Sequence, residues 1–382
     1  MGTFSGISFK FRTQVLSIAP AFCRQLEIRV RKLIHILTTL GLVSAFVASS
    51  AFADQKVPTT VTSGMGHGIN ALGYDPMWKD PDQARFKPGY YRMLKVAGFS
   101  FIRVPLIAFG HMDEDGTLDP QWLATLDDVV KRATDAGLAV ILDEHDYHIC
   151  GTNPDLCHRK LVSFWSQIAP RYKNAPQSVM FELMNEANTK MTPDKWNVVL
   201  ADLLKLVRKT NPHRRIVIGP ADYDSFKDLD KLKLPADDHN ILVTIHYYDP
   251  FRFTYQGAAW VKPSRKNDIG HKWGSDQDRK KVEQDFAKMA AWSRKTGRPV
   301  IIGEFGTYNK GDMASRARWT ATVARTAEKH KFAWCYWQFD YDFNAFDEKK
   351  GEWVTPLYQA LFPPKKPAGK TTKDLGKQLS EL

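Results

Sequence analysis

The chain has 382 residues, with 54 lysines and arginines against 42 aspartates and glutamates, and its formal net charge is +12. The first 53 residues hold six basic side chains and one acid, and the tail after Phe362 holds five lysines and two acids, so the stretch between them is only mildly basic. Because no basic helix or RNA-binding motif accompanies the charge, it indicates a solvated surface, and nucleic acid is not an expected partner.

The amino-terminal 53 residues have the pattern of an export signal. A basic segment precedes the mostly apolar stretch Leu33–Val47, and Ala51-Phe52-Ala53 has the A-x-A form of a cleavage site. We therefore expect a signal peptide over residues 1–53 and a mature periplasmic or secreted chain that begins at Asp54 and has no stable membrane association. An uncleaved anchor is the alternative, which the polar residues within the apolar stretch disfavour.

Short apolar runs then alternate with stretches of helical pattern. The apolar runs are Gly64–Asn70, Phe101–Leu106, Ala139–His145, Val179–Glu186, Ile216–Pro220, Ile241–Tyr248, Pro299–Gly306 and Ala333–Asp340. Helical patterns occupy Gln121–Ala136, Lys195–Thr210, Asp278–Thr296 and Ser315–Lys331. Strands that alternate with helices predict a parallel sheet, and eight such units in about 300 residues predict one α/β domain, a (β/α)8 TIM barrel.

This barrel is assigned to residues 54–362, and the basic residues 363–382 are expected to form a disordered tail. An open, doubly wound sheet is the alternative arrangement of the same elements. No glycine-rich dinucleotide-binding loop follows the first apolar run, which weakens that alternative.

The cysteines predict one disulfide. Cys150 and Cys157 lie in one expected loop after the third strand, and in an exported protein a bond that closes this loop is expected. A metal-binding cysteine knuckle would need a second pair of cysteines, and none is present. Cys335 lies within the last predicted strand and is expected to be a buried free thiol.

Two of the apolar runs end in carboxylates. Glu186 follows Asn185 at the end of the fourth run, and Glu304 lies between two glycines at the end of the seventh. The active site of a parallel barrel lies at the carboxyl ends of its strands, and glycoside hydrolysis needs a pair of carboxyl groups. Glu182 is a poorer partner for Glu186, because four residues of extended strand would separate the two by about 13 Å.

The motifs Phe181-Glu182-Leu183-Met184-Asn185-Glu186 and Ile302-Gly303-Glu304-Phe305-Gly306 resemble the acid/base and nucleophile strands of glycoside hydrolase family 5, the cellulase family. The resemblance is to bacterial endoglucanase-like members and extends over the whole predicted barrel. It implies a retaining endo-β-1,4-glucanase that cuts soluble glucans. It also implies that Glu304 is the nucleophile and Glu186 the general acid and base.

The resemblance assigns supporting or sugar-binding roles at other strand ends to Arg103, His145, Asn185, His246, Tyr248 and Trp337. In the family, the arginine and the tyrosine support the nucleophile, the second histidine orders the acid/base side, and the tryptophan lies under the sugar at the cleaved bond. The long aromatic loop Phe251–Trp273 resembles a loop of bacterial endoglucanases, and Trp260 is expected to form a wall of the groove.

Two other functions fit parts of the sequence. The polar cluster Asp143–His148, together with His246 and His67, offers ligands for a catalytic zinc ion. A barrel without catalytic activity that only binds glycans is the other. We expect no metal and no cofactor, a polysaccharide or oligosaccharide substrate and a monomeric enzyme. Mannan, xyloglucan, an exopolysaccharide and a periplasmic glucan remain alternative substrates.

Overall fold

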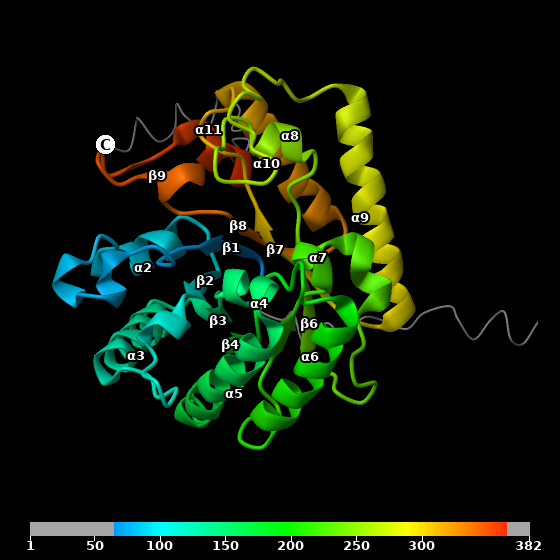
Figure 1. Cartoon of the computed structure of the whole chain (residues 1–382). Helices are drawn as coiled ribbons and strands as arrows, with labels where there is room; N and C mark the ends of the chain where they lie inside the picture. Colours follow the sequence, from blue (N-terminus) through cyan, green and yellow to red (C-terminus); the bar gives the residue numbers. More distant parts are fainter. Residues whose placement is uncertain (1–64, 365–382) are drawn as a thin grey trace, which may run out of the picture. The chain divides into compact units, whose positions relative to one another are not determined.

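The computed structural model describes residues 65–364, which contain a closed barrel of eight parallel strands (Figure 1). Strands that are neighbours along the chain are also neighbours in the barrel, and the last strand closes the ring against the first. The predicted (β/α)8 fold is therefore confirmed. The predicted signal peptide, and the predicted tail from residue 365 onwards, lie outside the described residues.

The barrel strands are short and largely buried. They are β1 (His67–Asn70), β2 (Phe101–Leu106), β3 (Ala139–Glu144), β4 (Val179–Glu182), β5 (Ile216–Ile218), β6 (Ile241–His246), β7 (Val300–Phe305) and β8 (Ala333–Tyr336). The fourth predicted strand was too long, because β4 ends at Glu182 and not at Glu186. The neighbouring β5 pairs with β4 only at Phe181 and Glu182, so the chain leaves the sheet before it reaches Glu186.

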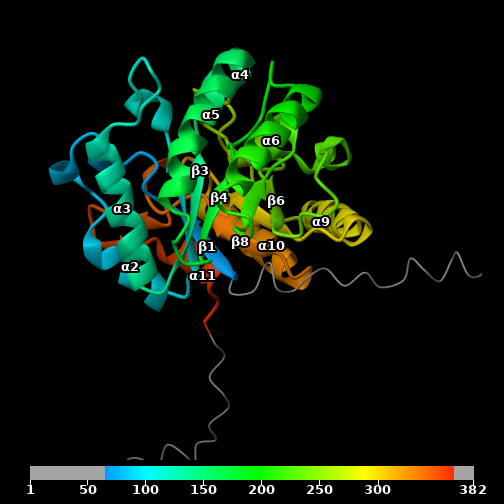
Figure 2. The same cartoon turned by 90° about the horizontal axis from the view of Figure 1, so that it is seen from below.

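Helices surround the barrel, as the turned view in Figure 2 shows. They are α2 (Pro88–Val96), α3 (Pro120–Asp135), α4 (Tyr147–Thr152), α5 (Pro154–Arg171), α6 (Pro193–Arg208), α7 (Ala221–Asp224), α8 (Phe251–Thr254), α9 (Asp276–Thr296), α10 (Met313–Lys329) and α11 (Thr355–Leu361). A short antiparallel pair, β9 (Phe346–Asp347) and β10 (Glu352–Trp353), precedes α11. No helix within residues 65–364 is long and apolar enough to cross a membrane.

The helix ends follow from the sequence. Proline occupies the first turn of α2, α3, α5 and α6, where the missing N–H would have had no helical partner. Ser275 and Asp278 form a capping box at the start of α9, and Gly297 ends that helix with φ 67°. The four predicted helical stretches correspond to α3, α6, α9 and α10.

Inside the barrel, an apolar layer supports a polar one. The apolar layer takes one residue from each of the strands β2 to β7 and two from β8: Phe101, Ile141, Met180, Val217, Leu242, Ile301, Ala333 and Cys335. Successive side chains of a strand alternate between its two faces, so the residue two positions further along points inward again. On β2, β3 and β4 that next inward residue is Arg103, Asp143 and Glu182, all fully buried. The strand period thus places charged groups directly above the apolar layer.

Cys150 and Cys157 form a disulfide, but the loop predicted between them is wrong. Cys150 lies in α4 and Cys157 in the first turn of α5, and Asn153 alone separates these helices. The Asn153 side chain accepts a hydrogen bond from the Leu156 N–H and caps α5, which starts inside the supposed loop. Cys335 is a buried free thiol.

Candidate active site

One guanidinium connects the buried polar groups at the carboxyl end of the barrel. Arg103 donates from Nε and Nη2 to the two oxygens of Glu182, at 2.7 and 2.9 Å. Its Nη1 donates to Glu304 Oε1 at 2.7 Å, and its Nη2 lies 3.0 Å from Asp143 Oδ2. Two amide oxygens also accept from this guanidinium, each at 2.9 Å; they belong to Asn70 and Asn185.

Three carboxyl groups therefore share one positive charge. Burial raises the pKa of Asp143 and of Glu182 to about 7, and Arg103 opposes both shifts. Although burial alone would lower the pKa of Arg103, the surrounding carboxylates raise it well above its usual value. Arg103 consequently stays charged and stabilises a negative charge on the residue that faces the cleft, which is Glu304.

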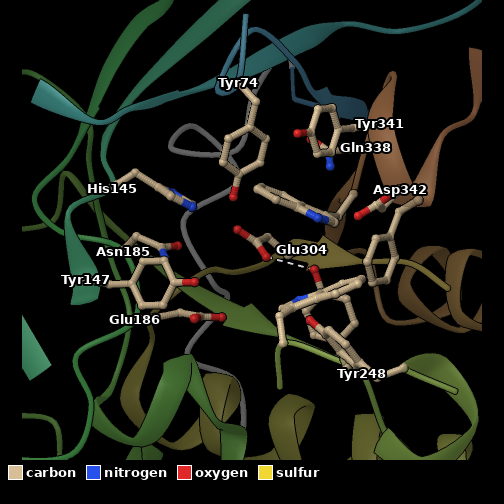
Figure 3. A pocket seen from close by; sticks show the side chains of 14 residues that line it. Tyr74, His145, Tyr147, Asn185, Glu186, Tyr248, Glu304, Gln338, Tyr341 and Asp342 are labelled. Carbon is tan, nitrogen blue, oxygen red and sulfur yellow. Dashed lines mark hydrogen bonds between the residues drawn. The ribbon is translucent and has the colours of Figure 1, made fainter. Parts of the chain in front are cut away.

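Glu304 lies in β7 and is held by two opposing donors. Arg103 donates to Oε1, and the hydroxyl of Tyr248 donates to Oε2 at 2.8 Å, the bond drawn in Figure 3. Burial raises the pKa of Glu304, whereas Arg103, then His145, and then the Tyr248 hydrogen bond act to lower it. These neighbours favour the carboxylate form, which is the form that can attack carbon.

Glu186 is held differently, in the loop beyond β4. Its φ of 45° is unusual for a residue with a side chain. The Glu186 N–H donates to Asp224 Oδ2 at 3.2 Å, and His246 Nδ1 lies 2.8 Å from Glu186 Oε1. Burial, and next the negative charge of Glu304, raise the pKa of Glu186 well above its usual value. Glu186 is thus the carboxyl group that retains a proton.

The two glutamates face one another across a short distance. His246 Nδ1 lies 2.8 Å from Glu186 Oε1 and 3.5 Å from Glu304 Oε2. One carboxylate oxygen of Glu186 and one of Glu304 lie within 4.8 Å of each other. Burial lowers the pKa of His246 well below its usual value, and Arg103 and His145 lower it further, so the imidazole between the two glutamates is neutral.

The pair opens into a cleft with aromatic walls (Figure 3). Trp337 and His145 lie parallel in this cleft, with ring centroids 5.6 Å apart and an interplanar angle of 5°. Flat aromatic rings of this kind stack against the apolar faces of sugars. The predicted site residues that line the cleft are His145, Asn185, Glu186, Tyr248, Trp260, Glu304 and Trp337.

The cleft continues beyond Glu186. A second hollow shares five lining residues with the first, namely Tyr147, Glu186, Tyr248, Tyr255 and Trp260. It adds His148, Phe226 and Phe251 on the far side of Glu186. The two hollows therefore share Glu186 and its aromatic neighbours, whereas Glu304 lines the first hollow. Of the predicted residues, His246 lines this second hollow, and the fully buried Arg103 acts from behind the cleft.

Several cleft residues were not found from the sequence. Tyr74, Tyr147, Gln338, Tyr341 and Asp342 line the same pocket as Glu304. Tyr341 and Asp342 follow β8. That strand ends at Tyr336, whereas the predicted strand extended to Asp340. Tyr147 lies within the polar cluster Asp143–His148, and Gln338 directly follows Trp337, but neither was singled out. For the other three, only the position of each loop relative to a strand end would have indicated it.

The residues that the sequence offered as zinc ligands do not all lie together. His67 is the first residue of β1 and lies 3.1 Å from Glu328, at the opposite end of the barrel from the cleft. His145 Nδ1 lies 2.6 Å from Asp143 Oδ2, and burial, followed by the charge of Arg103, lowers the pKa of His145 to about 4.

Two groups of residues within 65–364 do bring a histidine nitrogen and two carboxylate oxygens within 4.8 Å of one another. They are Glu182, Asp224 and His246, and Glu186, His246 and Glu304. The carboxylates of Glu182 and Glu304 already bind Arg103, and Glu186 binds His246. We therefore assign these groups as a hydrogen-bonded network and not as metal ligands.

Comparison with known proteins shows which family and which proteins this chain is similar to. The family model for cellulase, glycosyl hydrolase family 5, matches residues 63–343. Endoglucanase H of Acetivibrio thermocellus is 28% identical over 283 residues, which cover 72% of this chain and 30% of that protein. The chain thus corresponds to only a part of that longer relative.

The solved structures agree with the family match. Cel5A of Thermotoga maritima in complex with cellobiose is 35% identical, with a TM-score of 0.76, and the match covers 80% of this chain and 100% of that one. The same enzyme in complex with mannotriose gives the same identity, TM-score and coverage. The fold and the order of elements along the chain are therefore shared with a structure that binds β-linked sugars.

Proposed function

Because the chain belongs to the cellulase family, glycosyl hydrolase family 5, and is a glycoside hydrolase, we propose that it is a retaining endo-β-1,4-glucanase of soluble glucans. The separation of Glu186 and Glu304 carries the proposal: one oxygen of each lies within 4.8 Å of the other. Retaining glycosidases hold their two carboxyl groups about 5–5.5 Å apart, whereas inverting ones leave about 6.5–9.5 Å for a water molecule.

In the first step, the Glu304 carboxylate attacks the anomeric carbon while Glu186 gives its proton to the departing oxygen. A covalent glycosyl-enzyme forms, and the aglycone leaves as an alcohol. In the second step, Glu186 takes a proton from water, and the resulting nucleophile displaces Glu304 from the same carbon. Two inversions return the β-configuration.

The neighbours of each glutamate support this division of roles. Arg103 and Tyr248 donate to Glu304 and favour its charged form. Glu186 receives no hydrogen bond or ion pair from Arg103, and the charge of Glu304 helps it to keep a proton. Once Glu304 is bonded to the sugar, that charge is gone, the pKa of Glu186 falls, and Glu186 becomes the base of the second step.

Nuclear magnetic resonance of early products tests the mechanism. Hydrolysis of a soluble cello-oligosaccharide should give the β-anomer first, with the α-anomer appearing only by mutarotation. An α-anomer formed first would mean that water attacks directly and that the retaining mechanism is wrong.

Cleavage within the chain is supported by the second hollow, which shares Glu186 with the first and offers room for more sugars than the first hollow alone. The cellobiose complex of the related Cel5A supports a β-1,4-glucan, and its mannotriose complex makes mannan the first alternative. A panel of carboxymethylcellulose, barley β-glucan, glucomannan, mannan and xyloglucan, assayed for reducing ends and for viscosity, would decide. We expect a rapid fall in viscosity on a β-1,4-glucan, and the absence of that fall would exclude endo-cleavage.

Export is part of the proposal and rests on the sequence alone. The leader should be removed after Ala53, and the mature periplasmic or secreted enzyme should act as a monomer without binding to membranes. Amino-terminal sequencing of exported protein should begin at Asp54. Recovery of residues 1–53 on exported material would overturn the cleavage site.

A further inference from the structure

The connection between β5 and β6 contains a buried acid that the proposed mechanism does not use. Asp224 is 1% exposed, and its Oδ2 lies 3.4 Å from His246 Nε2 and 3.2 Å from the Glu186 N–H. His246 Nε2 is itself buried and forms no regular hydrogen bond with any described residue. Asp224, His246 and Glu186 thus lie in a row that leads from behind the cleft to the proposed acid/base.

The backbone places Asp224 there at a conformational cost. Asp222, Tyr223 and Asp224 have φ values of 60°, 61° and 54°, a left-handed run that is rare for residues with side chains. The Tyr223 N–H donates to the Ala187 carbonyl at 3.1 Å, and the Glu186 N–H donates to Asp224. These two bonds fasten the left-handed run to the segment that carries Glu186.

Gly219 provides the space for the Asp224 carboxyl group. A side chain at Gly219 would collide with both carboxyl oxygens of Asp224. Gly219 has no left-handed φ of its own, so the close approach of Asp224 accounts for the glycine. The Asp224 carboxyl group is therefore held against His246 by three features: the left-handed backbone, the space at Gly219, and the two hydrogen bonds to the Glu186 segment.

The position of the His246 proton follows from its surroundings. Nδ1 faces two carboxylate oxygens, 2.8 Å away on Glu186 and 3.5 Å away on Glu304. A lone pair at Nδ1 would repel the charged Glu304 and would draw the Glu186 proton that the first step needs for the departing oxygen, so we place the proton of the neutral ring on Nδ1. Nε2 then carries the lone pair, and the Asp224 oxygen that faces it is suited to donate a hydrogen bond to it.

The charges around Asp224 agree with a protonated carboxyl group. Burial raises the pKa of Asp224 well above its usual value, and the charge of Glu182 raises it further. The titratable and charged groups around this row are Arg103 on β2, Asp143 and His145 on β3, Glu182 on β4, Glu186 beyond β4, Glu304 on β7, and the tyrosines 147, 223, 248 and 255. Arg103 is the one cation among them, and its guanidinium already forms ion pairs with Asp143, Glu182 and Glu304.

We propose that Asp224 is a positioning residue of the active site: its protonated carboxyl group donates a hydrogen bond to the lone pair of His246 Nε2 and thereby fixes the proton of the neutral His246 ring on Nδ1, directed at the two glutamates. Oε1 of Glu186 then accepts from His246, which leaves the proton of Glu186 on Oε2, available to the departing oxygen. The inference rests on the proposed role of Glu186 as acid and base. The hydroxyl of a protonated carboxyl group can accept from the Glu186 N–H and donate to Nε2 through one oxygen, which neither atom of an amide can do.

The test is Asp224→Asn, which has the same shape. With its oxygen towards the Glu186 N–H, the amide accepts a hydrogen bond from Nε2–H and thereby favours the opposite His246 tautomer. ¹⁵N resonances of the labelled full-length enzyme should show the Nδ1–H form of His246 in the native protein and the Nε2–H form in Asp224→Asn. The alkaline limb of kcat/KM should move to higher pH, because Nδ1–H no longer stabilises the Glu186 carboxylate.

Substrates provide the second measurement. In Asp224→Asn, the Glu186 proton turns towards Nδ1, so kcat/KM on cello-oligosaccharides should fall about tenfold, while glycosylation by a dinitrophenyl glycoside should be unchanged. Gly219→Ala, which displaces Asp224, should reproduce the tautomer change. Asp222→Asn, an exposed neighbour in the same left-handed run, should leave the tautomer and the alkaline limb as in the native enzyme.

Outcomes for this inference differ from those for the proposed function. An unchanged His246 tautomer in folded Asp224→Asn would overturn the role of Asp224, whatever the activity. A native enzyme with the Nε2–H tautomer would do the same. If instead Glu186→Ala retained full activity on cello-oligosaccharides while the tautomer responded as expected, the assignment of Glu186 would fail and the Asp224–His246 contact would stand.

Discussion

Glu304 and Glu186 lie in one cleft, but the chain holds them in two different ways. Glu304 belongs to β7, is paired with His246 of the neighbouring strand, and accepts hydrogen bonds from a guanidinium and a phenol. Glu186 lies in a loop with a left-handed backbone and contacts a neutral imidazole and, through its N–H, a second acid. Glu304, the charged member of the pair, thus lies in a strand, and Glu186, the protonated member, lies in a loop with a strained backbone.

The comparison shows how one residue type acquires two functions. Both side chains are buried, and burial alone would raise the pKa of each. Arg103 and Tyr248 limit the rise for Glu304, and the charge of Glu304 adds to the rise for Glu186. When two neighbouring carboxyl groups have environments that separate their pKa values, the assignment of base and acid follows from those environments.

The comparison would be tested most severely by removal of Glu304. Glu304→Ala should lower kcat/KM on every substrate by roughly 10⁴- to 10⁶-fold, because no covalent intermediate can form. Added azide should give an α-glycosyl azide, since a small anion can enter from the side that the carboxylate vacated. A β-glycosyl azide from this variant would show that Glu304 is not the nucleophile.

Removal of Glu186 should have a smaller and substrate-dependent effect. Glu186→Ala should lose about 10²- to 10⁴-fold on cello-oligosaccharides, whose leaving group needs a proton. On a dinitrophenyl glycoside, the first step should proceed normally, and azide should accelerate the second and give a β-glycosyl azide. Equal losses on both substrates would contradict the role of Glu186 as acid and base.

Tyr248→Phe should make the surroundings of the two glutamates more alike. The hydroxyl is expected to stabilise charged Glu304 by about 1.5–3 kcal/mol, so its loss should lower kcat/KM by about 10- to 100-fold. Because that hydrogen bond lowers the pKa of Glu304, its removal should raise that pKa and move the acid limb of kcat/KM to higher pH.

Tyr247→Phe is the matched control for this change. It removes the same hydroxyl from the adjacent residue, where the group donates to Asp285, away from the cleft. Its acid limb should match that of the native enzyme. If both variants moved the limb equally, packing and not the bond to Glu304 would explain the shift.

The smallest expected effect is that of chelation. Since the carboxylates near His246 already bind Arg103 or His246 itself, treatment with EDTA followed by gel filtration should leave kcat/KM unchanged. Activity that was lost to EDTA and restored by Zn²⁺ would replace the two-glutamate account with a metal-dependent one.

The strand that holds Glu304 could be predicted from the sequence, whereas the loop conformation that holds Glu186 largely could not. Eight apolar runs separated by helical patterns predicted the barrel, because a strand buried on both faces consists mostly of apolar residues. Glu304 was predicted at the end of its strand, and it lies within β7, one residue before the strand ends. The sequence predicted Glu186 as the end of β4, yet the strand stops earlier and the residue adopts a backbone conformation for which glycine would have been the usual signal.

Asp224 remained undetected for a related reason. It is the last residue of the short element α7, and its place in the site depends on its contact with His246, a residue of the next strand. No periodicity or motif records such a contact. The helix that begins at Pro154 was likewise taken for a loop, although Asn153 and Pro154 are a good helix start.

The central claim is that Glu304 becomes covalently bonded to the sugar. A 2-deoxy-2-fluoro-β-cellobioside with a dinitrophenyl leaving group should inactivate the enzyme, because the fluorine slows both steps and the good leaving group restores only the first. Peptide mass mapping of the inactivated enzyme should locate one fluorocellobiosyl group on Glu304. A label on Glu186, or full turnover without any labelled peptide, would contradict the account.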